Sequence, residues 1–121
     1  MTPEALVERD CDKLADAYGY RVVRLSQRRG SRVHVGLPDR RYQGRRGAIF
    51  LEVKPDTGRL SAAQLAFLEA ELAAGALATV GGVHELGEVF SALVKAPGTA
   101  LDVCRRHVAA WEAKGIRREA A

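Results

Sequence analysis

Two acidic residues and one lysine are spaced in this chain so that their side chains can meet at one point. Asp39 ends the turn Gly36-Leu-Pro-Asp39, and Glu52 and Lys54 alternate with apolar residues along residues 48–54. Successive side chains of a strand take opposite faces, so Glu52 and Lys54 share one surface. Two converging carboxylates can hold a hard divalent cation, and the carbonyl of Val53 can supply a third oxygen. The spacing therefore predicts a metal site.

The chemistry that suits this arrangement is hydrolysis of a phosphodiester. A divalent cation activates water and neutralises the phosphate, and a nearby ammonium stabilises the transition state. Lys54 lies about 6.5–7 Å beyond Glu52 along the same face of a strand, so both side chains can reach one phosphate. The alternative interpretation is a plain surface ion pair between Glu52 and Lys54.

The elements that would position these residues follow from periodicity and from capping signals. Thr2 and Pro3 open a helix whose apolar positions repeat at helical spacing, and Ser61-Ala-Ala-Gln64 is a capping-box pattern. Pro97-Gly98 separates the last two helices, and Thr99 is the expected cap of the final one. The patterns predict helices over residues 3–18, 61–75, 86–94 and from 100 onward, strands over 21–25, 48–54 and 76–80, and an extended stretch after Asp39. This order predicts an α/β fold with a small mixed sheet flanked by helices.

Positive charge is concentrated in the middle of the chain. Residues 21–59 hold eleven Lys and Arg against three Asp and Glu, nearly all of the cations being arginine, whereas the whole chain has a formal charge of +4. Such a zone suits a phosphate backbone, although it can also be a solvated face. The candidate DNA contacts are Arg28, Arg29, Arg32 and Arg59. Arg40, Arg41, Arg45 and Arg46 add positive charge next to Asp39, where DNA would approach.

The remaining composition points to an ordinary globular domain. The 121 residues are 47% hydrophobic and 28% charged, which is sufficient for a single core. Without an export signal or an apolar run of membrane-spanning length, we expect a cytoplasmic protein with no membrane partner. We expect Cys11 and Cys104 to be core residues and His107 to face solvent. The Trp111 stripe is either part of the core or a dimer interface.

Several segments together resemble the VRR-NUC branch of the PD-(D/E)xK nuclease superfamily. These segments are Gly36-Leu-Pro-Asp39, Leu51-Glu-Val-Lys-Pro55, Gly58-Arg-Leu-Ser61 and Gln64, and the similarity covers residues 4–83. The resemblance implies a restriction-endonuclease-like core over residues 1–95, followed by a C-terminal helical extension over residues 96–121.

The resemblance also implies a function, namely Mg²⁺- or Mn²⁺-dependent hydrolysis of DNA. Asp39 and Glu52 would be metal ligands, Val53 would lend its carbonyl, and Lys54 would be the catalytic cation. Stand-alone members of the branch are similar to Holliday junction resolvases, which act as dimers. We therefore expect an endonuclease for branched or structured DNA, working as a homodimer in a bacterial or phage-infected cell.

Two further site residues rest on this resemblance. The family places an acid on its first helix, which is either Glu4 or Glu8. The helical angle of 100° per residue favours Glu4, because it sets Glu8 further toward the rim, although the helix dipole alone favours an acid in a first turn. Gln64 would be an active-site residue, and the capping box explains it equally well.

Two other functions remain open. A PD-(D/E)xK fold can grip nucleic acid without cutting it, as a subunit of a larger DNA-processing complex. Alternatively, the basic loop can contact an acidic protein partner. Steep salt dependence of binding would favour nucleic acid over the protein partner.

Overall fold

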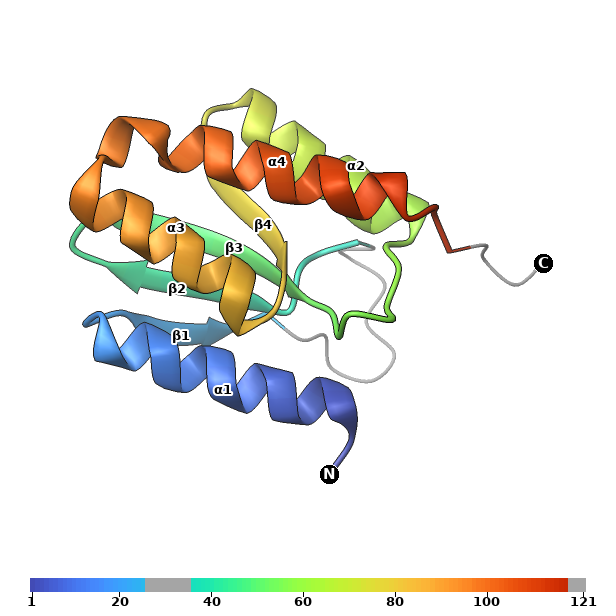
Figure 1. The fold of residues 1–121 in the computed structure, drawn as a ribbon, viewed down its shortest axis with the longest axis horizontal. Helices are drawn as coiled ribbons and strands as arrows, with labels where there is room; N and C mark the ends of the chain where they lie inside the picture. Colours follow the sequence, from blue (N-terminus) through green and yellow to red (C-terminus); the bar gives the residue numbers. More distant parts are fainter. Residues whose placement is uncertain (26–35, 118–121) are drawn as a thin grey trace.

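The computed structural model describes residues 1–25 and 36–117, and these form a four-stranded sheet with helices packed around it (Figure 1). The strands are β1 (Arg21–Arg24), β2 (Arg40–Gly44), β3 (Gly47–Val53) and β4 (Leu77–Gly81), and they lie in the sheet in that order. β1, β2 and β3 are antiparallel neighbours, whereas β4 runs parallel to β3. The predicted α/β class with a small mixed sheet flanked by helices is confirmed.

The helices begin where the capping signals are. α1 (Pro3–Ala17) starts after Thr2, whose hydroxyl accepts a hydrogen bond from the Ala5 amide at 3.1 Å. α2 (Ala62–Ala73) starts after Ser61. α3 (Val83–Lys95) begins three residues earlier than expected, and α4 (Ala100–Ala113) follows a short 3₁₀ turn, η1 (Pro97–Thr99). Thr99 is not a side-chain cap, because its hydroxyl instead donates to the Ala96 carbonyl at 2.7 Å.

The helices cover both faces of the sheet. α1 and α3 pack side by side on the face that carries Arg40 and Tyr42, while Phe67 of α2 packs edge-on against Phe50 of the opposite face. α4 runs along β4 and contacts both α2 and α3 (Figure 1). α4 belongs to the same hydrophobic core as the rest of the described chain, so residues 100–113 are packed into one unit with residues 1–25 and 36–95.

Three side chains of the core settle expectations from the sequence. Cys11 and Cys104 are free and fully buried, as expected. Trp111 is 5% exposed and packs in the core, so it does not offer a dimer interface. His107 is 9% exposed, and the expectation that it faces solvent is wrong: its ring lies between the Thr79 hydroxyl and the Glu88 carboxylate, each at 2.8 Å. No helix in the described part of the chain is long and apolar enough to cross a membrane.

Candidate active site

The candidate site lies where β3 ends. The carboxyl end of β3, the N-terminal end of α1 and the segment that follows α4 lie on one side of the molecule (Figure 1). Asp39 directly precedes β2, and the register pairs Arg40 with Leu51, so Asp39 lies beside the last residues of β3. Its Oδ2 accepts a hydrogen bond from the Val53 amide at 3.0 Å. The sheet register therefore brings the predicted acid of the turn to the predicted Glu-x-Lys strand.

Glu52 is the unusual group of this site, because it is an acid with only 2% exposure. Burial, then the charge of Asp39 and a hydrogen bond to it, raise the pKa of Glu52 to about 9, while the Lys54 charge acts in the opposite direction. Ionisation of Glu52 is therefore opposed both by its burial and by the neighbouring carboxyl group of Asp39. A divalent cation between them would remove that conflict.

Lys54 continues β3 by one residue, since its amide donates to the Gly81 carbonyl of β4 at 3.0 Å. Its Nζ lies 4.0 Å from Glu52 Oε2, and its side chain is 10% exposed. A methyl group on Gly58 would lie 3.2 Å from the Lys54 Cδ, so the following loop closes tightly over the Lys54 side chain. Lys54 is thus held beside Glu52, at a position that is largely shielded from water.

The first helix supplies two acids. Carboxylate oxygens of Glu4, Glu8 and Asp39 lie within 4.8 Å of one another, which is close enough for one metal ion. Glu4 is exposed, and partial burial followed by the charge of Asp39 raises its pKa. The sequence set Glu8 further toward the rim, and this is wrong: Glu8 belongs to the cluster and is the more buried of the two.

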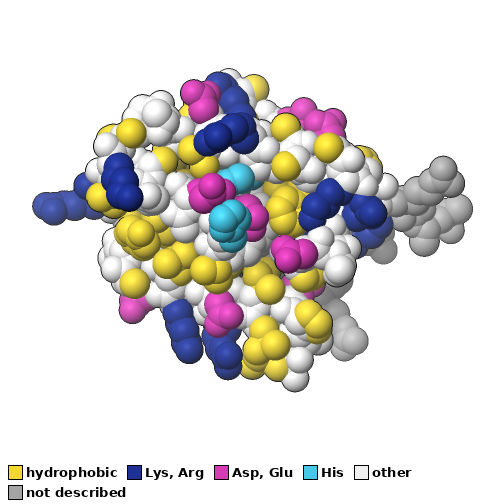
Figure 2. Space-filling model, in the orientation of Figure 1, with side chains coloured by type: hydrophobic (Ala, Val, Ile, Leu, Met, Phe, Trp, Pro, Cys, Tyr) yellow, Lys and Arg dark blue, Asp and Glu magenta, His cyan; other side chains and the backbone are white. Residues whose placement is uncertain are grey.

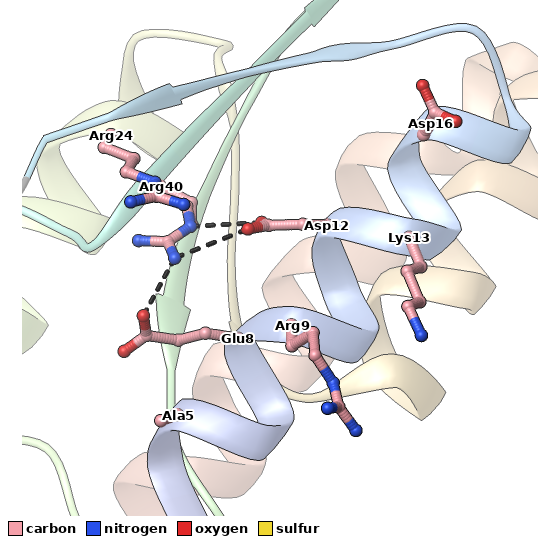
Figure 3. A pocket seen from close by; sticks show the side chains of 8 residues that line it. All are labelled: Ala5, Glu8, Arg9, Asp12, Lys13, Asp16, Arg24 and Arg40. Atoms are coloured by element: carbon pink, nitrogen blue, oxygen red, sulfur yellow. Dashed lines mark hydrogen bonds and ion pairs between the residues drawn. The ribbon is translucent and has the colours of Figure 1, made fainter. Parts of the chain in front are cut away.

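Arg40 explains why Glu8 is drawn inward. This arginine is 4% exposed, and Figure 3 shows Glu8 and Asp12 of α1 both pointing at its guanidinium. The bonds measure 2.8 Å to Glu8 Oε2 and 3.1 Å to Asp12 Oδ1, and a third reaches the Asp39 carbonyl at 3.3 Å. The Tyr42 hydroxyl donates to Asp12 at 2.7 Å. Arg40 therefore links α1 to the residue that carries the candidate metal ligand.

The sequence counted Arg40 among the cations that DNA would meet, and this was wrong. The sheet explains the error, because Arg40 shares a face of β2 with Tyr42, and their partners Leu51 and Ile49 are fully buried. Its neighbours in sequence also have intramolecular partners: the Arg41 guanidinium lies 5.8 Å from the centre of the Phe50 ring, and Arg46 donates to the Leu93 carbonyl.

Gln64 forms the predicted capping box. The Gln64 side-chain Oε1 accepts a hydrogen bond from the Ser61 backbone N–H at 2.8 Å, and the Gln64 backbone N–H donates to the Ser61 hydroxyl at 3.1 Å. The start of α2 also touches the turn that carries Asp39, since a Cβ on Gly36 (φ +85°) would lie 2.4 Å from the Ala63 carbonyl oxygen. The cap is confirmed, whereas the roles of Gln64 and of the Val53 carbonyl in chemistry stay predictions.

The predicted DNA contacts are only partly described. Arg28, Arg29 and Arg32 lie outside the described residues. Arg59 donates to the Lys114 carbonyl beyond α4. On the face of the molecule over α3 and α4, Lys and Arg side chains are scattered and form no single patch (Figure 2). Positive side chains do gather beside the candidate site, where Lys54, Arg59 and Arg117 line a cleft of about 380 Å³ together with Glu4.

Comparison with known proteins finds no similar protein. No family model matches the chain, and neither a curated protein nor a solved structure matches it.

Proposed function

We propose that this chain is a metal-dependent deoxyribonuclease of the VRR-NUC branch of the PD-(D/E)xK superfamily, with a restriction-endonuclease-like core. The observation that carries the proposal is the pairing of two carboxyl groups at the end of β3. Asp39 accepts a hydrogen bond from the Val53 amide, its charge raises the pKa of the buried Glu52, and Lys54 lies beside Glu52. Packing alone does not favour two acids in contact inside a protein.

The donor set suits Mg²⁺ or Mn²⁺. All side-chain donors are carboxylate oxygens, which hard cations prefer, and Glu4 and Glu8 add further oxygens within reach of Asp39. Asp39 and Glu52 would hold the ion, with Glu4 and the Val53 carbonyl as further ligands. When bound, such an ion activates water and neutralises charge on the phosphate.

The other residues have roles that follow from their contacts. Lys54 presents an ammonium beside the carboxylates, where it can stabilise the negative charge that develops on a phosphate under attack. Arg40 is a positioning residue, because it holds Glu8 and the backbone of Asp39 in one network. The preference for branched or structured DNA, the homodimer and the bacterial or phage-infected host cell come from the sequence resemblance alone.

The test is cleavage of fluorescent four-way junction, flap and linear duplex DNA with Mg²⁺, Mn²⁺ or EDTA. We compare the wild type with Glu52→Gln, which keeps the size of the side chain, and with Glu112→Gln on the exposed face of α4. We expect metal-dependent cleavage that falls by about 10³-fold in Glu52→Gln, of the order seen when a group that stabilises the transition state is removed. Glu112→Gln should cut like the wild type.

Two outcomes would contradict the proposal. Full cleavage by a folded Glu52→Gln variant would exclude Glu52 from the chemistry. Tight, salt-sensitive DNA binding by the wild type without cleavage under any metal would favour the non-cleaving nucleic-acid-binding module.

A further inference from the structure

The segment after α4 is tied back to the loop that carries Lys54. Lys114 Nζ donates to the Asp56 carbonyl at 2.7 Å, and Arg59 donates to the Lys114 carbonyl. The Arg117 amide donates to the Leu60 carbonyl at 2.7 Å, forming a parallel bridge between Ser61 and Arg117. These bonds join residues about 55 apart in the sequence, so the position of Arg117 is set by tertiary structure.

Both sides of this connection are anchored in the core. Leu60 is fully buried, and Trp111 packs in the core at the end of α4. The Lys114 ammonium lies 3.7 Å from the centre of the Trp111 ring, an arrangement that is itself attractive. Gly115 adopts a φ of +99°, which lets the chain turn toward the loop at low cost. Arg117 is therefore held at a defined place, on the same cleft as Lys54.

The Arg117 side chain lines the cleft between the two segments. The walls of this cleft include Lys54, Arg59 and Arg117 with Glu4. Arg59 already donates to Lys114, whereas no described carboxylate lies at ion-pair distance from the Arg117 guanidinium, although Glu4 is near enough for its charge to be felt. The planar guanidinium has donors suited to two oxygens of a phosphate.

We propose that Arg117 binds a phosphodiester of the DNA backbone next to the one that is cut beside Lys54, and that Arg59 is a positioning residue which holds Arg117 in place. The inference rests on the proposed function and deepens it. Arg117 lies outside residues 4–83, so the resemblance to the nuclease branch assigns it no role. The proposal also gives the segment after α4 a function that the sequence did not predict.

The test measures binding rather than cleavage. In a Glu52→Gln background, the dissociation constant for a fluorescent DNA junction is followed by anisotropy over a range of NaCl concentrations. Each phosphate contact contributes about 0.7–0.9 to the slope of log affinity against log salt concentration. We expect Arg117→Ala to reduce the slope by that amount, and Arg117→Lys to retain most of it. The matched control is Arg105→Ala, which removes another exposed charge, whose partner is Asp102 on α4.

A second readout separates Arg59 from Arg117. Arg59→Ala should weaken binding and also speed hydrogen exchange at the Arg117 amide, because the bond to Leu60 opens more often. Arg117→Ala should weaken binding and leave exchange at that amide slow. Equal salt slopes in Arg117→Ala and Arg105→Ala would overturn the inference while leaving the cleavage test untouched. Conversely, an Arg117-dependent slope together with a wild type that cleaves no DNA under any metal would refute the nuclease and retain the phosphate site.

Discussion

Two clusters of charge are built into this protein only a few residues apart, and they are balanced differently. In the Arg40 cluster, a buried guanidinium faces Glu8 and Asp12, and Tyr42 donates to Asp12. In the site cluster, Glu52 faces Asp39, and the only cation in ion-pair contact with either carboxylate among the described residues is Lys54 at 4.0 Å. The first cluster has a partner for each charge. The second retains a conflict between like charges.

This difference separates charged groups that stabilise the fold from charged groups that are suited to bind a ligand. Buried charges are tolerated when they are paired, so the Arg40 cluster can be explained by structure alone. A buried acid next to a second, half-buried acid lowers stability unless a proton or a cation binds between them. Perturbed pKa values with a specific partner are typical of functional sites. The site cluster is therefore where chemistry is expected.

The sharpest test of the comparison is the pH dependence of stability without metal. Glu52 has a pKa of about 9 in the folded protein against 4.5 ordinarily, so between these values the folded state binds more protons than the unfolded state. Stability must then fall as the pH rises from about 4.5 to about 9. Since each pKa unit corresponds to about 1.4 kcal/mol, the upper limit of this effect is several kcal/mol. Glu52→Gln should abolish most of the decline.

Thermal melts in EDTA at pH 5, 7 and 9 would measure this decline. Adding Mg²⁺ or Mn²⁺ at high pH should restore the melting temperature of the wild type and leave that of Glu52→Gln nearly unchanged, because binding to the folded state alone stabilises it. A wild type whose stability does not change over this pH range would show that the charges of Glu52 and Asp39 do not destabilise the folded protein.

Mutation of Arg40 should lower the stability of the protein, whereas Glu52→Gln removes a cause of instability. Arg40→Met leaves the partly buried Glu8 and Asp12 without their cation, and the loss of stability should approach the value of about 3 kcal/mol for a fully buried pair. Urea unfolding would measure the loss. The control is Arg105→Met, whose surface pair with Asp102 contributes at most about 1 kcal/mol. An Arg40→Met protein as stable as the control would show that the cluster contributes little to the fold.

The contrast also shows which features the sequence could predict. β3, the Thr2 cap and the capping box at Ser61 were predictable because their signals lie within a few residues. Asp39, Glu52 and Lys54 could be placed together because strand periodicity and one turn determine their positions. Within the described chain, the local pattern therefore identified the elements and the centre of the candidate site.

What the sequence missed depends on partners far along the chain. Arg40 was counted as a surface cation because its partners lie 28 and 32 residues earlier, on α1. Glu8 was set at the rim for the same reason. His107 meets Glu88 and Thr79 across three elements, and Arg117 reaches the site only because α4 ends beside Leu60. Sequence periodicity predicts on which face of a helix or strand a residue lies, but it does not predict which other elements pack against that face.

The smallest expected effect comes from a third pair, His107 and Glu88, which joins α4 to α3. The hydrogen bond from His107 lowers the pKa of Glu88, an effect that burial partly opposes. Because the folded-state pKa lies below 4.5, the stabilisation is complete above about pH 4.5 and is lost as the pH falls through the folded value. Glu88 is 48% exposed, so the pair should contribute about 1 kcal/mol or less.

Thermal melts from pH 7 down to pH 3 would compare the wild type with Glu88→Gln and with Glu112→Gln. The melting temperature of Glu88→Gln should lie slightly below that of the wild type at pH 7 and converge on it at pH 3, whereas Glu112→Gln should follow the wild type throughout. A gap that widens on acidification would mean that Glu88 is held in its protonated form. Glu88 would then resemble Glu52, an acid whose surroundings raise its pKa, rather than the paired charges of the Arg40 cluster.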